Sequence, residues 1–291
     1  MAETEVEVLH YSLDLDLVRS PAASVIPDAP GLIRCACTMT VRGSGSEPVR
    51  SARFILYRLL RVSTAREGPD IPAAFRQALW AVDGTPDHHV NAVDVEFAKP
   101  IPPGHQRTLR LTYEGTLVGY REVMAYVHDS VQRDVALLRP EVLWYPVPGG
   151  ATKDIVHRAY ATPGFDAIVR CPEGWWVTMA GARREPDVAG VPRFTGVDGY
   201  GDGLLLVAGQ YKERSGDGYV TVHHLPGHAA WADAVIEAAA FTASTLTEWL
   251  GPRVSQRDPL VLVEIPGHWE NGRKARAPPD GHAVLCSERA Y

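Results

Sequence analysis

Cysteine is scarce in this sequence. Only four cysteines occur among 291 residues (Cys35, Cys37, Cys171 and Cys286), and none belongs to a Cys-x-x-Cys pair. A chain of this length buries enough surface to fold without covalent cross-links. We therefore expect reduced, buried thiols rather than a disulfide scaffold or a cysteine-rich metal site.

Long hydrophobic runs and a signal-like start are also missing. No apolar run approaches the roughly 18 residues of a membrane span. The first residues, Met1-Ala2-Glu3-Thr4-Glu5, are acidic and lack the basic, then apolar, pattern of a secretory signal. We expect a cytoplasmic protein with no membrane segment in this chain.

Basic residues are fewer than acidic residues in this sequence. Thirty-five acidic residues against 29 basic ones give a formal net charge of −6, the wrong sign for a protein that binds by neutralising phosphates. Nucleic acid is not an expected partner. The sequence also lacks a Gly-x-Ser-x-Gly nucleophile motif, a phosphate-binding loop and a dinucleotide fingerprint, so nucleotide binding has no support.

Alternating apolar and polar residues are the first positive signal. Every second residue is apolar from Leu9 to Leu17, and the same period of two returns from Ile33 to Val41. This period is typical of half-buried strands. It places Cys35 and Cys37 on one inward face, where core packing is favoured over metal binding.

Further strands are predicted in the same part of the chain, each bounded by turn-forming residues. They span 54–62, 90–97, 108–113, 165–170, 175–179, 204–208 and 219–223. A helical turn is predicted near Ala73 to Trp80. Residues 1–225 are therefore expected to form a mainly β amino-terminal domain, with two packed antiparallel sheets in a saddle-like or sandwich-like arrangement.

The pattern changes after residue 225. From Ala229 to Leu250 apolar residues recur every three or four positions and Gly251-Pro252 follows, which predicts an amphipathic helix over 229–250. Strands are expected near 259–265 and 282–287. Residues 226–291 are thus predicted to start an α/β domain that is truncated, because one helix and two strands supply little surface for an independent core.

Two groups of histidines raise the question of a metal site. His224 and His228, with Glu248 further on, are metal-ligand residue types, but Pro226-Gly227 breaks any helix between the histidines. A strand, a turn and a following helix are the favoured interpretation, and a zinc hydrolase built on these residues is a remote alternative. The pair His88-His89 is expected in an exposed polar turn.

The segment Gly267-His268-Trp269-Glu270-Asn271 follows the predicted strand 259–265. It resembles the Gly-x-Met-Glu-Asn motif of the zinc aminopeptidases related to membrane alanyl aminopeptidase, which are gluzincin metallopeptidases. Other segments are similar to landmarks of the amino-terminal β-domain in that family: His10 to Leu17, Trp144-Tyr145-Pro146-Val147, Pro172-Glu173-Gly174-Trp175, and Leu206 to Tyr211. The sequence departs from the family at Trp269, which replaces Met, and no His-Glu-x-x-His zinc motif occurs in the 291 residues.

The resemblance implies a fold and a substrate-binding site. The implied fold is a β-domain followed by an incomplete portion of a thermolysin-like domain. In the family the motif glutamate binds the free α-amine of a peptide and the first motif residues offer backbone groups, which implies substrate-binding roles for Gly267, His268 and Glu270. A carboxylate pairs well with an ammonium, and an exposed strand edge can add a peptide as a further strand. No catalytic or metal-binding residue is assigned.

Two hypotheses of different classes follow. The first is an aminopeptidase-like protein that is a fragment or a shortened relative, inactive as it stands, with zinc expected only where the missing catalytic region is present. The alternative is a non-catalytic β-sandwich module for protein interaction. The expected partners are a peptide amino terminus and a protein partner or second copy of the chain, because unpaired sheet edges leave surface to be covered.

Overall fold

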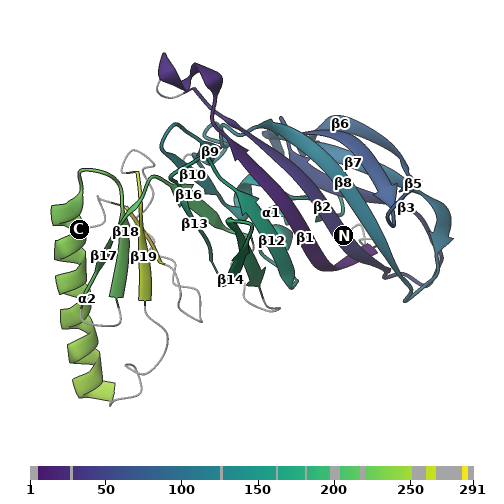
Figure 1. The fold of residues 1–291 in the computed structure, drawn as a ribbon. Helices are drawn as coiled ribbons and strands as arrows, with labels where there is room; N and C mark the ends of the chain where they lie inside the picture. The colour runs from purple at the N-terminus through teal and green to yellow at the C-terminus, as the bar shows by residue number, and fades with distance from the viewer. Residues whose placement is uncertain are drawn as a thin grey trace.

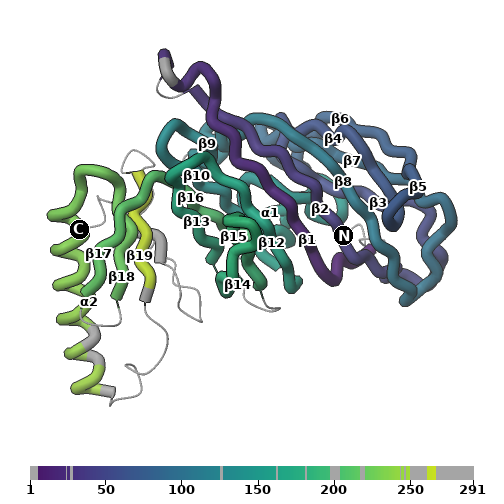
Figure 2. The backbone as a smooth tube through the Cα atoms, viewed as in Figure 1, coloured from purple at the N-terminus to yellow at the C-terminus, as the bar shows by residue number. Residues whose placement is uncertain are grey.

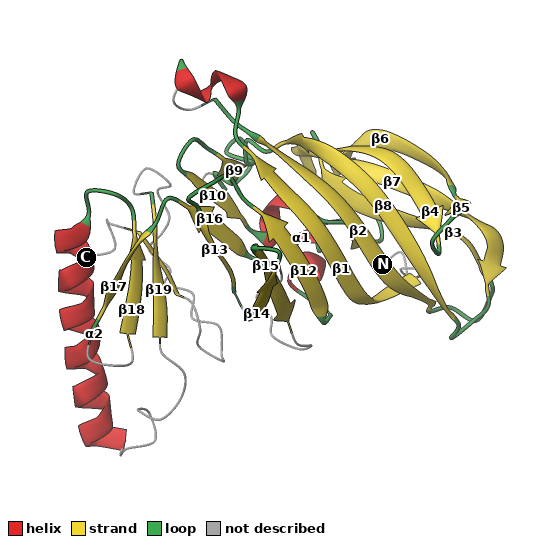
Figure 3. Cartoon of the chain, viewed as in Figure 1, coloured by secondary structure: helices red, strands yellow, loops and turns green. Residues whose placement is uncertain are grey.

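The structure is a computed structural model that describes residues 6–26, 29–124, 127–161, 163–180, 182–196, 204–216, 220–250, 260–266 and 284–287. Within these ranges the chain is mainly β, as predicted (Figure 1). Three sheets are built from strands that precede residue 210, and a fourth sheet follows with the long helix α2 (Ala229–Leu250) on one side of it (Figure 3).

The first sheet has eight strands, in the order β14-β15-β12-β1-β2-β8-β4-β5. Their bounds are β1 (Val6–Val18), β2 (Leu32–Gly43), β4 (Arg61–Glu67), β5 (Ile71–Pro72), β8 (Gln106–Thr116), β12 (Phe165–Arg170), β14 (Ala182–Val188) and β15 (Val191–Gly196). Neighbours pair antiparallel except β1 and β12, which pair parallel. The parallel pair is an exception to the predicted antiparallel arrangement.

Two four-stranded sheets complete this part of the molecule. The second sheet has the order β11-β3-β7-β6, and the third has the order β13-β16-β10-β9. Their bounds are β3 (Val49–Tyr57), β6 (Ala74–Val82), β7 (Thr85–Ile101) and β11 (Val147–Pro148), then β9 (Ser130–Val131), β10 (Val135–Leu138), β13 (Trp176–Met179) and β16 (Leu206–Gly209). Three short helices lie between strands: η1 (Pro21–Ser24), η2 (Pro140–Val142) and α1 (Ile155–Tyr160).

One hydrophobic core joins these three sheets. It contains alternate residues of β1 and β2, including Cys35 and Cys37, together with residues of β3 and β7 and of β10, β13 and β16. The sequence predicts two sheets, whereas three share this core, because a twisted sheet of eight strands is wider than one four-stranded sheet can cover. The predicted inward face of Cys35 and Cys37 is confirmed, and both are free thiols.

The fourth sheet combines β17 (Lys212–Ser215), β18 (Val220–His224), β19 (Leu260–Ile265) and β20 (Val284–Ser287), in that order. β17 and β18 are antiparallel, whereas β18, β19 and β20 are parallel. Ala232 and Val235 of α2 pack on Val220, Val222 and Leu262 of the sheet. Helix 229–250 and the strand before it are therefore confirmed, and so is a mixed α/β arrangement after the β-rich part.

Two local predictions are wrong. Residues Ala74–Val82 form strand β6 instead of a helical turn, because they pair with β7 and because the Gln77 amide donates to Leu60 O and accepts from Val62 N. The predicted strand 54–62 is divided between β3 and β4, with a turn at residues 58–59.

His88 is the third correction. It lies in β7 with only 5% of its surface exposed, and its ring packs edge-on against Tyr120 at 4.4 Å between centroids. The sequence suggested an exposed turn because Thr85-Pro86-Asp87 is rich in turn formers, but the long strand β7 extends through it.

None of the described helices is both long and apolar enough to cross a membrane. The backbone tube in Figure 2 shows η1 projecting beyond the end of β1. Just after η1, Val25 and Ile26 are largely exposed.

Candidate functional site

The carboxyl edge of the fourth sheet is the place where the topology favours a site. β18, β19 and β20 run parallel, so all three end at the same edge. In sheets with parallel strands, ligands bind in the crevice beyond the carboxyl ends. The turn that joins β18 to α2 and the residues that follow β19 both start at this edge.

Glu264 is a charged residue at this edge, and its side chain is fully buried. Its Oε2 accepts a hydrogen bond from the backbone N–H of Leu225 at 2.6 Å, and its Oε1 lies 2.5 Å from Nδ1 of His228. Its backbone carbonyl accepts a hydrogen bond from the Tyr211 hydroxyl at 2.8 Å. We call these four residues the Glu264 network.

The Glu264 network fixes the end of β19. It ties the last residues of that strand to the β18–α2 turn on one side and to Tyr211 on the other. A buried carboxylate is costly unless it is paired and hydrogen-bonded, so these contacts strongly favour one position of the turn. The chain therefore leaves β19 at Ile265 and Pro266 from a strand end that these contacts hold in place.

Aromatic rings join this sheet to the third sheet. The ring of His223 stacks on Trp176 of β13, with centroids 3.7 Å apart and planes 19° apart, and Trp176 meets Tyr211 edge-on at 5.7 Å. Burial, with a smaller contribution from His224, lowers the pKa of His223 to about 4, so this ring is neutral at pH 7. Burial, then the charge of Glu264, raises the pKa of the Tyr211 hydroxyl. Trp175, directly before β13, makes a different contact, because the Arg19 guanidinium lies over its ring at 5.0 Å from the centroid.

His224, His228 and Glu248 are not brought together. Nδ1 of His224 lies 2.9 Å from the carbonyl oxygen of Leu225, while Nδ1 of His228 faces Glu264. His228 precedes α2 and Glu248 lies near the other end of that helix; at about 1.5 Å per residue, the two are about 30 Å apart along its axis. These residues do not fit a zinc site, and in the described ranges no three His, Cys, Asp or Glu side chains are grouped as metal ligands would be.

The residues implied by the family resemblance, Gly267, His268 and Glu270, lie outside the described residues. Pro266, which directly precedes them, is described and buried. The sequence interpretation did not single out Glu264. A signal was present, because one carboxylate inside the apolar run Leu260 to Ile265 requires a buried partner.

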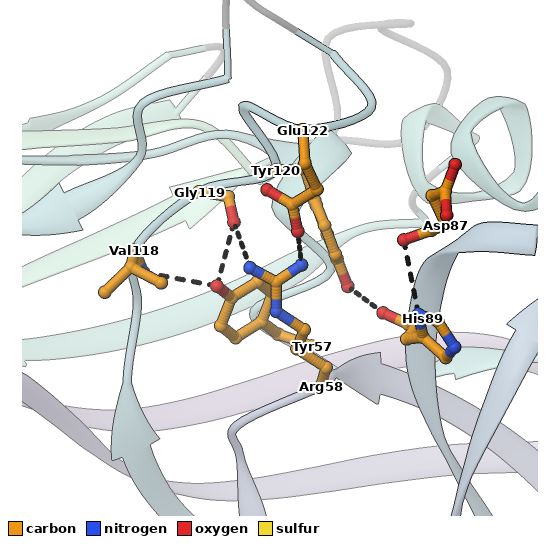
Figure 4. Close-up of polar contacts among 8 residues, drawn as sticks. All are labelled: Tyr57, Arg58, Asp87, His89, Val118, Gly119, Tyr120 and Glu122. Atoms are coloured by element: carbon orange, nitrogen blue, oxygen red, sulfur yellow. Dashed lines mark hydrogen bonds and ion pairs between the residues drawn. The ribbon is translucent and has the colours of Figure 1, made fainter.

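A second polar cluster lies in the β-rich part, around Arg58 (Figure 4). The Arg58 guanidinium pairs with Glu122 and lies over the rings of Tyr57 and Tyr120, at 5.4 Å and 4.9 Å from their centroids. The Tyr57 hydroxyl donates to the carbonyl of Gly119 at 2.8 Å.

Further contacts in Figure 4 give this cluster a structural role. The Tyr120 hydroxyl donates to the carbonyl of His89 at 3.0 Å, and the Val118 N–H donates to the Tyr57 hydroxyl at 3.3 Å. His89 Nδ1 lies 3.2 Å from the carbonyl oxygen of Asp87. These contacts hold the segment after β8 against the second sheet.

Comparison with known proteins gives a result at the level of the fold. No protein-family model matches the sequence, and no curated protein is detectably similar to it in sequence. Among solved structures, the M1 zinc metallopeptidase from Deinococcus radiodurans matches with a TM-score of 0.57 and 17% identity, over 98% of this chain and 61% of that one. Yeast LTA4 hydrolase, solved with bestatin, matches with a TM-score of 0.60 and 11% identity, over 98% of this chain and 42% of that one.

The fold is therefore one that zinc metallopeptidases also have, which confirms the predicted resemblance to such enzymes in its coarse form. This chain spans about three fifths of the length of the Deinococcus radiodurans enzyme. That enzyme has also been solved with a Tyr-Ser-Ala substrate, in a structure that matches 90% of this chain with a TM-score of 0.52 and 18% identity. The specific link to membrane alanyl aminopeptidase stays a prediction.

Proposed function

We propose that this chain is an aminopeptidase-like protein that binds the free amino terminus of an extended peptide through Gly267, His268 and Glu270, and that it does not hydrolyse the peptide as the 291-residue chain. In this proposal residues 1–225 are the amino-terminal β-domain and residues 226–291 start a catalytic-like domain. Glu270 pairs with the α-ammonium, and backbone groups of Gly267 and His268 hydrogen-bond to the peptide.

The observation that carries the proposal is the anchoring of β19. Its carboxyl end is held by the Glu264 network, three residues before Gly267. Recognition of an ammonium requires a carboxylate whose backbone does not move away from the ligand. Support also comes from the shared fold with metallopeptidases, one of which has been solved with a peptide substrate.

Peptide binding is tested by titrating the purified chain with a tripeptide that has a free amino terminus and with its N-acetylated form. We expect binding of the free peptide only. Glu270→Gln should weaken this binding about tenfold or more, because a charge-assisted hydrogen bond becomes a neutral one. Glu248→Gln is the matched control, since it makes the same change at an exposed carboxylate of α2. Equal binding of the acetylated peptide would refute recognition of the amine.

Lack of hydrolysis is tested separately. The sequence contains no His-Glu-x-x-His motif, and hydrolysis in this class needs a Lewis acid to polarise the carbonyl and a general base. Aminoacyl anilides with added zinc should show no turnover by the 291-residue chain. Robust turnover that a chelator abolishes would overturn this part of the proposal and leave amine recognition intact.

The alternative, a non-catalytic interaction module, is favoured by one observation. Strand β6 is a long, exposed sheet edge with apolar side chains. Such an edge adds strands from other chains, whether or not the carboxyl edge of the fourth sheet binds a peptide.

A further inference from the structure

The ends of the four sheets differ in how they are protected against pairing with another chain. Exposed edge strands are usually short, charged or interrupted by proline. β14 carries two arginines, two acids and a proline within seven residues, and β17 reads Lys-Glu-Arg-Ser. β5, β9 and β11 are two residues long. β13 and β20 are four residues long, and Trp176 of β13 is covered by His223.

β6 has none of these protections. It has nine residues, Ala-Phe-Arg-Gln-Ala-Leu-Trp-Ala-Val, and lies at the end of the second sheet, paired within it with β7 (Figure 1). Arg76 is its one charged residue, and it contains neither proline nor glycine. Leu79 and Trp80 are 58% and 40% exposed.

The two faces of β6 have different environments. Phe75 and Gln77 point toward the interior, where Phe75 packs on the main core and Gln77 reaches the start of β4. Alternation then puts Arg76, Ala78 and Trp80 together on the outer face. These three residues are exposed.

The outer face already contains one contact between a guanidinium and Trp80. Arg53 of β3 lies over the Trp80 ring at 4.0 Å and forms a two-pronged pair with Asp94 of β7 at 2.6 and 3.0 Å. Asp94 is the register partner of Arg76 on β6. The face therefore alternates cations, an anion and an indole ring, and a cation over an indole is a favourable contact.

We propose that β6 is a homodimer interface at which β6 of a second copy of this chain adds antiparallel, about a twofold axis at Ala78. In this register residue i faces residue 156 − i of the partner copy, so Arg76 of each copy lies opposite Trp80 of the other. Phe75 faces Ala81, Gln77 faces Leu79 and Ala74 faces Val82. The second sheets of the two copies become one continuous sheet.

Self-complementarity is the reason to infer a second copy as the occupant. A twofold axis at Ala78 converts one arginine and one tryptophan into two equivalent cation–indole pairs. An axis at Arg76 would instead place two guanidinium groups directly opposite each other, which is destabilising. The single charge of β6 therefore favours an axis at Ala78 over an axis at Arg76.

The test uses the full 291-residue chain without peptide, so its outcome is independent of the proposed peptide binding. Sedimentation velocity over a range of concentrations should show a monomer–dimer equilibrium. Ala78→Lys and Ala78→Glu should each weaken the dimer on the order of tenfold or more, because each places like charges opposite each other at the axis. An equimolar mixture of the two variants should restore dimers that contain one copy of each.

The matched control is Val188→Lys, which adds the same charge to the exposed, protected edge strand β14 and should leave the dimer unchanged. Circular dichroism checks that each variant is folded, and recovery of the mixed dimer proves it. A monomer at every concentration would overturn the proposal. So would a dimer that Ala78→Lys does not weaken but that Phe241→Ser, on the exposed face of α2, dissociates.

Discussion

The contact between His228 and the buried carboxylate of Glu264 allows a quantitative prediction. Replacing His228 with alanine leaves the Glu264 carboxylate, which is fully buried, with the Leu225 N–H as its remaining partner in the network. Removing one member of a buried pair costs about 3–5 kcal/mol. Because the His228 side chain is 34% exposed, water replaces part of the lost contact, and we expect a loss of about 2–3 kcal/mol in the free energy of unfolding.

The cause of that loss is separated by a double-mutant cycle with Glu264→Gln. A glutamine amide still accepts from the Leu225 N–H but carries no charge, so removing His228 in that background should cost about 1 kcal/mol, the value of an ordinary hydrogen bond. The coupling energy between the two positions is then about 1–2 kcal/mol. Urea denaturation followed by tryptophan fluorescence measures all four proteins.

A surface pair supplies the control for this cycle. His10 and Asp166 also form a histidine–carboxylate pair, at 3.0 Å, but their side chains are 41% and 52% exposed. His10→Ala should therefore change stability by less than about 1 kcal/mol. If His228→Ala and Glu264→Gln were additive to within about 0.5 kcal/mol, the contact between these two residues would not fix the turn.

Three further predictions concern pH, backbone strain and thiol reactivity. Because the pKa of His223 falls from 6.5 to about 4 on folding, the unfolded chain takes up a proton at a higher pH than the folded chain does, and stability should decrease as pH falls from about 6.5 toward 4. His223→Phe should make that decrease less steep in urea titrations at several pH values, and the remaining part belongs to His88, whose pKa is also lowered to about 4. Gly119→Ala should lower the thermal midpoint strongly, because φ is +70° and a Cβ would lie 2.0 Å from a backbone oxygen. Gly68→Ala, where φ is +58° and the space is open, should lower the free energy of unfolding by only about 1 kcal/mol. Equal losses of stability in the two variants would contradict this reasoning. Burial raises the pKa of both Cys35 and Cys37, the former to about 12. Neither thiol should therefore react with iodoacetamide at pH 8 until the chain unfolds. Mass mapping of labelled peptides would reveal an accessible thiol.

Local patterns in the sequence were sufficient to predict the elements that bury one regular face. The alternation from Leu9 to Leu17 and from Ile33 to Val41 specified β1 and β2, because a period of two can bury one side only in a strand. The spacing of apolar residues and the turn at Pro226-Gly227 likewise specified α2 and the strand before it.

Long-range partners decided what these patterns left open. Ala74 to Val82 is a strand because β7 lies beside it, and His88 is buried because Tyr120, distant in the sequence, packs on it. Three sheets rather than two share the core, because the apolar face of the eight-stranded sheet is wider than one four-stranded sheet can cover. Of the candidate site, the sequence supplied Gly267, His268 and Glu270 through a resemblance, whereas Glu264, Leu225 and His228 were linked only by the tertiary fold.

The sequence by itself therefore determined the periodic faces, the mainly β class, the long helix and the lack of a zinc-binding motif in these 291 residues. Only the tertiary structure decided which strands became edges, which charges were buried and which of them met. The physical reason is that periodicity reports the burial of one face, whereas the partner of a buried charge or of an edge strand depends on chain segments far away in the sequence.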